Sequence, residues 1–414
     1  MTTAALHRAA VQRRTVRTLT AAQVFSSLGN GSTLALGSVL AYDLTGRESL
    51  AGTTTMALGI GTALSAIPLA RLALSHGRRV ALGTGLGTAI VGTFAMVAAV
   101  VWSSYPVLLL GSALVGVATA VNLQARFAVT DLAEPHRRGR ELSLVVWAIT
   151  VGAVLGPNTV APGAVLAAPF GLPPYAGAFL ISAAGMVIGG VIVLVGLRPD
   201  PLLTRRHLDG TLPPAHRGSW ASGARILRAH PVALGAVVGM VGAHAAMVAV
   251  MSMTPLHIEH RSPGPDDHTL TVIGVTISLH IAGMYALSPV VGALTDRLGP
   301  RVVTAAGLVT TITSTVVAAV GAAHLGWVTV ALVLLGLGWC GATVAGATLL
   351  TGAIPPERRV EAQGFADAVV SLVGASGAAV AGLVMGGLDY PGVAIVFGIL
   401  AALAAVTSWI LTRS

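Results

Sequence analysis

Charge is scarce in this chain of 414 residues: only 9% of the residues are Asp, Glu, Lys or Arg, whereas 54% are hydrophobic. A soluble domain cannot cover so much apolar surface with so few charges, so the composition excludes the soluble globular classes. Aromatic residues are also few, at 4%, and the apolar runs lack a two-residue alternation, which argues against an outer-membrane β-barrel. The single cysteine, Cys340, excludes an internal disulfide and a cysteine-based metal site.

Long apolar runs are what the sequence has in place of charge. Each is about 20 residues long, enough to cross a hydrocarbon core of about 30 Å as a helix, which satisfies its own backbone hydrogen bonds in lipid. The predicted spans lie near residues 18–42, 50–70, 79–101, 106–128, 142–165, 176–197, 232–255, 270–291, 302–322, 327–350, 362–386 and 391–411. We therefore expect an all-α membrane protein with twelve transmembrane helices in a lipid bilayer.

Lysine is absent, and all 24 basic residues are Arg. With the predicted spans in place, 22 of them fall on one side of the membrane and only Arg47 and Arg261 on the other, which is the asymmetry that marks cytoplasmic loops. The net charge of +9 therefore reports topology and does not indicate a nucleic-acid partner. We expect a multi-pass protein of the inner (cytoplasmic) cell membrane with both termini in the cytoplasm.

Two pairs of loops repeat at nearly the same offset along the chain. Gly77 and Gly299 are 222 residues apart, and Arg138 and Arg359, in a second pair of similar loops, are 221 apart. This agreement indicates an internal duplication of six helices, and secondary transporters use such pseudo-symmetric halves for alternating access. The predicted parts are an N-terminal six-helix bundle at 1–197, a cytoplasmic linker rich in Arg and Pro at 198–231, and a C-terminal six-helix bundle at 232–414.

The loop between the eighth and ninth predicted spans is similar to G-x-x-x-D-R-x-G-x-[RK], the loop signature of the major facilitator superfamily. Its matching residues are Gly292, Asp296, Arg297, Gly299 and Arg301. The copy in the first half keeps Gly77 and Arg79 but has Leu74 and Ser75 in place of the acid and the arginine. The resemblance implies the twelve-helix major facilitator fold, and it does not extend to a gating charge lock in the first half.

A second motif lies in the fifth predicted span. Gly152, Gly156 and Pro157 are similar to the G-x-x-x-G-P core of a signature found in drug/proton antiporters, although the glycine pairs that continue that signature are missing. The resemblance implies proton-coupled efflux of small hydrophobic or organic compounds as one hypothesis.

Methionine and histidine gather in the seventh and eighth predicted spans, where five of the nine non-initiator methionines lie between residues 240 and 284. Helical spacing places two sets each on one helix face: Met240, His244, Met247 and Met251 in the seventh span, and His280 and Met284 in the eighth. Counted from the outer helix ends, His280 is predicted to be level with His244. Thioether sulfur and neutral imidazole suit Cu(I), whereas flexible core filling and inter-helix hydrogen bonds would give the same pattern.

The pairs M-x-x-x-M and H-x-x-x-M in these spans resemble the paired motifs of a bacterial copper-importing family within the superfamily. That family also includes members believed to carry riboflavin, so the short motifs do not fix the substrate. The resemblance implies copper as the leading substrate, with riboflavin-like nutrient uptake as an alternative.

Acidic residues are nearly absent from the spans, and Asp367, early in the eleventh, is the clear candidate for proton coupling or for a charge that favours a helix N-terminus. Asp131, beside arginines at the cytoplasmic edge, is predicted to form an interfacial ion pair. By resemblance, helices 1, 4, 7 and 10 line the central cavity of the fold. Candidate wall residues are Gln23, Asn30, Asn122 and Trp339.

The sequence has no catalytic dyad, phosphate-binding loop or soluble domain larger than the linker, so we expect no enzyme activity and no cofactor. The expected protein is a monomeric secondary active transporter that works by alternating access. Its partner would be a small solute or a metal ion.

Overall fold

The structure is a computed structural model that describes residues 3–134, 138–209, 220–261, 267–355 and 358–413. These residues are almost entirely helical, and no strand occurs among them. They group into two compact units. The first unit comprises Met1–Leu36 and Ala57–Ala215, and the second comprises Gly37–Met56 and His216–Ser414.

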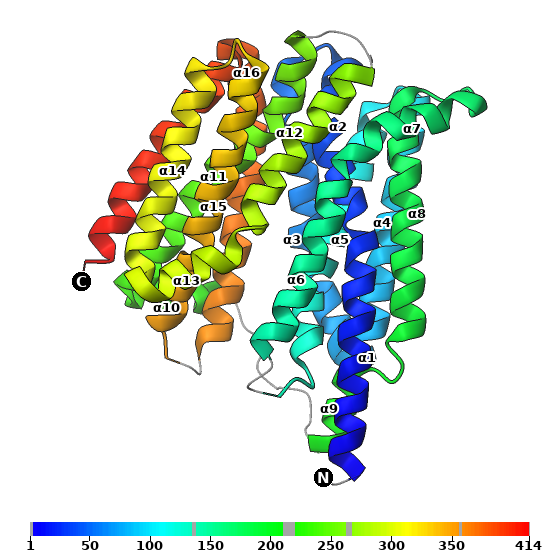
Figure 1. Ribbon diagram of the computed structural model, residues 1–414, viewed down its shortest axis with the longest axis vertical. Helices are drawn as coiled ribbons and strands as arrows, with labels where there is room; N and C mark the ends of the chain where they lie inside the picture. The colour runs from blue at the N-terminus through cyan, green and yellow to red at the C-terminus, as the bar shows by residue number, and fades with distance from the viewer. Residues whose placement is uncertain (1–2, 135–137, 210–219, 262–266, 356–357, 414) are drawn as a thin grey trace. The chain divides into compact units, whose positions relative to one another are not determined.

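The helices of the first half of the chain follow one another with short connections (Figure 1). They are α1 (Thr3–Ser26), α2 (Leu28–Thr45), η1 (Glu48–Leu50), α3 (Thr53–His76), α4 (Arg78–Val101), α5 (Tyr105–Thr130), α6 (Arg138–Leu155), η2 (Pro157–Thr159), α7 (Val160–Ala167), η3 (Ala168–Phe170), α8 (Pro174–Gly196) and α9 (Pro201–Asp209). The end of α2, η1 and the start of α3 belong to the second unit.

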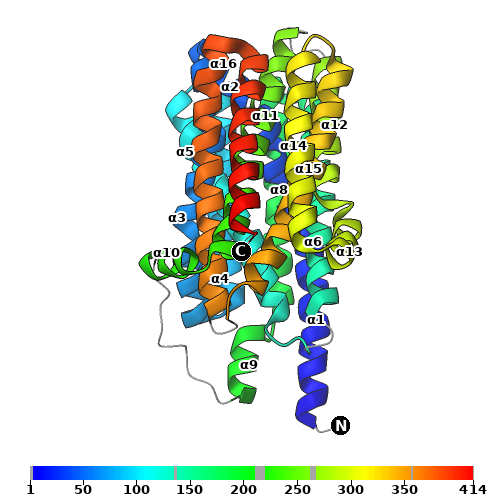
Figure 2. The ribbon, with the colours of Figure 1, turned by 90° about the vertical axis from the view of Figure 1, so that its left-hand side faces the viewer.

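The second half continues with helices that all lie in the second unit. They are α10 (Trp220–Ala229), α11 (Pro231–Arg261), α12 (Asp267–Tyr285), α13 (Ser288–Leu298), α14 (Pro300–Val320), α15 (Leu325–Gly352) and α16 (Arg359–Leu411). In Figure 2 the short helix α10 lies across the direction of the long helices.

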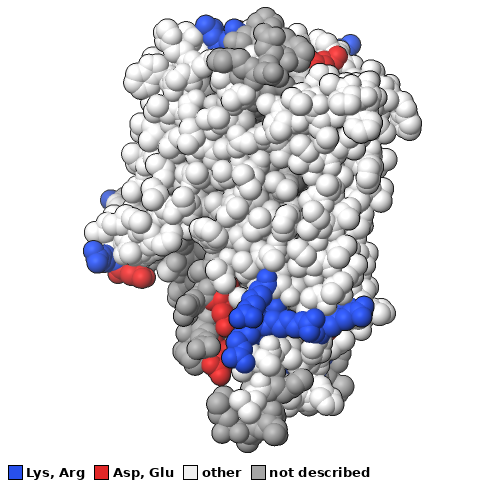
Figure 3. Space-filling model, turned by 45° about the vertical axis from the view of Figure 1, so that its right-hand side comes forward, with Lys and Arg blue, Asp and Glu red and all other residues white. Residues whose placement is uncertain are grey.

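Among the described residues, ten helical stretches are long and apolar enough to cross a membrane. The last of them, within α16, holds two spans, because Asp389 interrupts the helix with a φ of 56° and the chain turns back there (Figures 1 and 2). With α1 and α2 paired as one more, the described helices agree with the twelve spans that were predicted. On the face drawn in Figure 3, charged atoms gather toward the helix ends and leave the long middle uncharged.

Several predicted spans differ in detail from the observed helices. The first predicted span starts earlier in the structure, at Thr3. The added polar turns contact α5, because the side chain of Gln12 donates to the carbonyl of Val129 at 2.6 Å. The fifth and eighth spans are each interrupted, at Pro157 and ahead of Pro289, since proline removes a backbone donor. The predicted linker contains α9 and α10.

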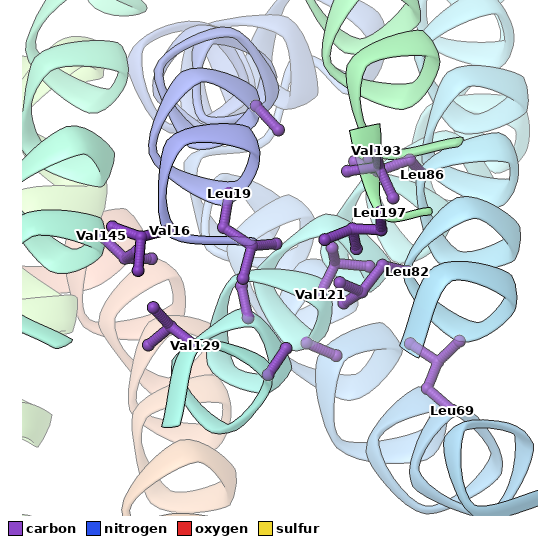
Figure 4. Packing of buried hydrophobic residues seen from close by; sticks show 14 of the residues in the cluster. Val16, Leu19, Leu69, Leu82, Leu86, Val121, Val129, Val145, Val193 and Leu197 are labelled. Atoms are coloured by element: carbon purple, nitrogen blue, oxygen red, sulfur yellow. The ribbon is translucent and has the colours of Figure 1, made fainter. Parts of the chain in front are cut away.

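Apolar packing and close helix approach hold the first unit together. A buried cluster joins α1, α4, α5 and α8, with Leu19, Leu82 and Val121 pointing toward one another (Figure 4). At the crossing of α3 and α5, a Cβ on Gly61 or Gly116 would collide with the backbone carbonyl of the opposite helix. Only glycine permits this contact, so Gly61 and Gly116 allow α3 and α5 to approach until their backbones touch.

Candidate functional site

Three ring side chains from three helices of the second unit meet in one cluster, the ring cluster: His244 on α11, Tyr285 on α12 and Trp339 on α15. The indole Nε1–H of Trp339 donates to Nδ1 of His244 at 2.9 Å. The ring of Tyr285 stands edge-on to Trp339, with centroids 5.7 Å apart. All three side chains are partly exposed, although they lie on helices whose other faces are buried. The cluster therefore offers accessible aromatic surface within a membrane protein.

The hydrogen bond fixes the chemical state of His244. An indole nitrogen can only donate, so Nδ1 must accept and the proton of the neutral ring is on Nε2. The Nε2 edge lies against Gly374 of α16, where a Cβ would be only 2.7 Å from that nitrogen. Gly374 thus leaves room for the imidazole, and the cluster combines stacking surfaces with an N–H donor.

The methionines of α11 are buried in helix packing. Met240, Met247 and Met251 expose 6%, 3% and 4% of their surface. Met240 packs against α15, where a Cβ on Gly346 would lie 3.2 Å from its sulfur. No group of three or more His, Cys, Asp or Glu side chains within the described ranges is arranged to hold a metal ion. The methionine sites, whose ligands would be thioether sulfurs, remain a prediction.

His280 on α12 is completely buried. Its Nδ1 donates to the carbonyl of Leu332 on α15 at 2.7 Å, and its Nε2 has no hydrogen-bond partner. Leu332 and Trp339 are seven residues apart on α15, which corresponds to about 10 Å along the helix. His280 is therefore not at the same depth as His244, although counting residues from the outer helix ends had predicted equal depth. Met251, seven residues beyond His244 on α11, lies closer to the depth of His280.

Buried polar side chains line helices of the first unit as well. Gln23 accepts a hydrogen bond from Ser26, but its Nε2 has no partner, and the same holds for Oδ1 of Asn122 on α5. Both residues are buried. The side chain of Asn30 lies outside the described residues. Gln23 and Asn122 as wall residues of a cavity remain predictions.

The glycine–proline motif of the fifth span packs against the interruption between α1 and α2. A Cβ on Gly152 would collide with the carbonyl of Val24, and one on Gly156 would lie 2.6 Å from the carbonyl of Leu28. The hydroxyl of Ser32 on α2 donates to the carbonyl of Gly156 at 3.1 Å, and it also contacts the hydroxyls of Thr159 and Ser182 at 2.8 Å. The motif thus brings two interrupted helices into contact within the first unit.

The repeated loops have the same backbone conformation. Gly77 and Gly299, which precede α4 and α14, have φ values of 91° and 87°. Beyond this turn the two loops differ. In the second half Asp296 and Arg297 are exposed, and Gly292 has open space around it. Arg301 lies over the Trp409 ring at 4.0 Å.

The first-half loop holds a charge pair that the motif comparison missed. Arg78 Nε lies 2.9 Å from Asp131 Oδ2, which confirms the ion pair predicted for Asp131. Burial raises the pKa of Asp131 even though the bond to Arg78 opposes this shift. Asp200 accepts the backbone N–H of Arg79 at 2.7 Å, at the start of α4. Acids distant in sequence therefore take the place of the one missing at Leu74.

Asp367 lies on an exposed face in the third turn of α16. Its place near the helix start agrees with either of the two roles predicted for it. Proton coupling through this residue stays a prediction.

The sequence of this chain matches a family model and several known proteins. The family model of the Major Facilitator Superfamily matches residues 19–265 and 265–414. This chain belongs to the major facilitator superfamily. Two uncharacterized MFS-type transporters of Bacillus subtilis (strain 168) are similar: YdeG, 32% identical over 94% of this chain and 90% of its own, and YddS, 33% identical over 91% and 86%. The riboflavin transporter RfnT of Brucella anthropi is 28% identical over 87% of this chain and 86% of its own.

Solved structures of this superfamily share the fold. A bacterial homolog of the human lysosomal transporter Spinster, in an inward-facing and unoccupied conformation, has a TM-score of 0.74 at 15% identity and covers 97% of both chains. The nucleoside transporter NupG, as a D323A mutant, also has a TM-score of 0.74, at 17% identity, over 96% of this chain and 99% of its own. As a member of the superfamily, with relatives that are MFS-type transporters, the chain is a multi-pass membrane transporter of a small solute.

Proposed function

We propose that this transporter takes up a planar aromatic solute of the flavin class and recognises it at the ring cluster. The observation that carries the proposal is the hydrogen bond between Trp339 and His244, with Tyr285 edge-on to the indole. A rigid, hydrogen-bonded indole offers a stacking face whose orientation is already fixed before the solute arrives, so little side-chain entropy is lost on binding.

The cluster also supplies polarity suited to a flavin ring. The isoalloxazine ring carries carbonyl oxygens and ring nitrogens at its edge, and the Nε2–H of His244 is a donor of matching type. The similarity to a protein named as a riboflavin transporter supports the same solute class.

Copper uptake is a second candidate, and one observation favours it. His280 donates from Nδ1 to a backbone carbonyl and leaves its Nε2 lone pair without a partner, as histidine ligands of metals commonly do. Met284 follows one helical turn later, and Met251 is close in depth. Drug efflux is a weaker candidate, because the motif that suggested it, Gly152 to Pro157, is accounted for by helix packing.

The test is riboflavin binding to the purified protein, followed by the quenching of flavin fluorescence that stacking on an indole produces. Trp339→Ala is expected to weaken binding at least thirtyfold, because it removes the stacking face, and Trp339→Phe about fivefold, because it keeps a ring but loses the bond to His244. The control is Trp327→Ala, since Trp327 lies on the same helix but is 55% exposed at its outer end.

The same experiment separates the candidates. Unchanged riboflavin affinity in Trp339→Ala would remove the flavin proposal. Copper accumulation in vesicles that is lost in the double variant Met247→Ala/Met251→Ala, with Trp339→Ala unaffected, would instead favour the metal.

A further inference from the structure

His280 differs from the histidines of the neighbouring helix α11 in its burial and in its hydrogen bonds. It exposes none of its surface, it makes one hydrogen bond, and that bond uses Nδ1. His244 and His257, on the neighbouring helix α11, are bound to Trp339 and to the carbonyl of Ala322. Only the ring nitrogen Nε2 of His280 is buried without a partner among the described histidines.

The single hydrogen bond defines what Nε2 can do. A carbonyl only accepts, so Nδ1 carries the proton of the neutral ring and Nε2 presents a bare lone pair. Leaving such an acceptor buried and unpaired is unfavourable, because it has lost its hydrogen bond to water. A proton on Nε2 would use this lone pair and would strengthen the bond to Leu332, because donors on a charged ring bind more strongly.

The present surroundings do not stabilise that charge. The charged and titratable side chains on α11 and α15, which pack against α12, are Cys340 on α15 and His244, His257, Glu259, His260 and Arg261 on α11. No hydrogen bond or ion pair in the described structure joins any of them to His280. A charged imidazole without a counter-ion in an apolar setting needs water. Protonation of His280 therefore requires the contact between α12 and α15 to open.

The helix that carries His280 is built so that it can move. α12 ends at Tyr285, five residues after His280, and α13 begins at Ser288 with a proline in its first turn. α12 and α15 touch through backbone at Gly336 of α15, where a Cβ would collide with the carbonyl of His280. An interrupted helix in a smooth glycine contact can tilt with little side-chain rearrangement.

We propose that His280 is the proton-binding site that couples proton movement to solute transport: it is neutral when α12 packs on α15 and takes up a proton at Nε2 when this contact opens. The imidazole ring takes the proton from water when the contact opens and returns it to water when the contact closes again. The transport assay below rests on the proposed flavin-class solute, whereas the labelling assay does not.

The transport test uses the purified chain in liposomes with an imposed pH gradient. His280→Asn keeps a side-chain N–H that can donate to Leu332 but cannot titrate. We expect it to lower proton-driven riboflavin accumulation at least tenfold while riboflavin counterflow, which needs no net proton movement, stays within twofold of wild type. Asp367→Asn, the competing candidate, is expected to keep accumulation. Normal accumulation in His280→Asn, or its loss only in Asp367→Asn, would overturn the proposal.

A second test needs no solute, because Cys340 is the only cysteine and lies buried on α15. Cys340 follows Gly336, which contacts α12, by about one helical turn on α15, so we expect opening of this contact to raise the rate at which a maleimide labels Cys340. The measured quantity is the ratio of the labelling rate of wild type to that of His280→Asn, with His280→Gln as a second variant. We expect this ratio to rise at least threefold as pH falls through the histidine range. A ratio that stays constant with pH would contradict the proposal, as would stoichiometric Cu(I) binding that disappears in His280→Asn.

Discussion

The two units of this transporter share a repeated loop conformation but differ in the partners of the polar groups that they hold. In the first unit two groups of them bind one another: Arg78 pairs with Asp131, and Ser32 contacts the hydroxyls and the carbonyl at the interruptions of the first and fifth spans, whereas Gln23 and Asn122 each keep an unpaired atom. In the second unit the comparable groups are an accessible ring cluster and a histidine with an unpaired nitrogen.

This difference shows how a duplicated fold can divide its tasks. Polar groups that pair with one another give a fixed arrangement, whereas unpaired or accessible polar groups leave interaction energy for a solute or a proton. Substitutions at the paired groups of the first unit should therefore act mainly on stability, and substitutions at the ring cluster and at His280 mainly on binding and coupling.

Removing one partner of the buried ion pair should have the largest effect. Arg78→Gln leaves the Asp131 carboxylate buried without its cation, and we expect the free energy of unfolding in mixed micelles to fall by about 3–5 kcal/mol. Riboflavin affinity of the remaining folded protein should not change.

Arg79→Gln is the matched control for this prediction. Arg79 is the next residue, and the bond recorded at this position uses its backbone N–H rather than its guanidinium. An equal loss of stability in both variants would show that the pair itself contributes little and would weaken the contrast between the units.

A methyl group in the helix contact of the first unit should have the next largest effect. In Gly152→Ala the new Cβ collides with the carbonyl of Val24, and overpacking of this kind costs about 1–3 kcal/mol of unfolding free energy. Gly87→Ala on α4, where the space is open, is expected to be neutral or slightly stabilising in the same unfolding measurement. If Gly152→Ala instead left stability intact and abolished efflux of an organic cation, the antiporter hypothesis would regain support.

The sequence predicts the fold well because hydropathy and loop repeats are local signals. The spans could be read from residues close together in the chain, and the loops that repeat around Gly77 and Gly299 have the same positive-φ glycine turn. The interruption of the fifth span was less evident, although Pro157 marks it, because hydropathy does not change there.

The site was less predictable because its partners are distant in sequence. His244 and Trp339 were identified as separate candidates, but 95 residues separate them and nothing in their spacing indicates that they bond. Asp200 was not identified, since its role depends on the end of α8 approaching the start of α4. The depth count for His280 failed because helix ends do not fix the vertical offset between packed helices.

Within the second unit, the space beside His244 offers a finer test of the ring cluster. In Gly374→Ala a Cβ would lie 2.6 Å from the imidazole Cδ2, so the ring must shift away from Trp339. We expect riboflavin affinity to fall about tenfold, which is about 1.4 kcal/mol, with little change in stability.

Two comparisons make this result specific. Gly364→Ala on the same helix has open space and should leave affinity unchanged. In a His244→Ala background, Gly374→Ala should have no further effect, because the ring that it displaces is gone. Additive losses in the double variant would mean that Gly374 acts independently of His244.

The smallest expected effect compares the two repeated loops directly. Asp200 accepts the N–H groups of Arg79 at 2.7 Å and of Leu202 at 3.0 Å, so it stabilises the starts of both α4 and α9. Asp200→Ala is expected to lower the free energy of unfolding by about 1 kcal/mol, as the loss of a helix cap does. In the second half the exposed Asp296 should tolerate Asp296→Ala with a change below about 0.5 kcal/mol. If Asp296→Ala proved the more costly, the signature loop rather than the distant acid would be the structural anchor, and the division of tasks between the units would have to be redrawn.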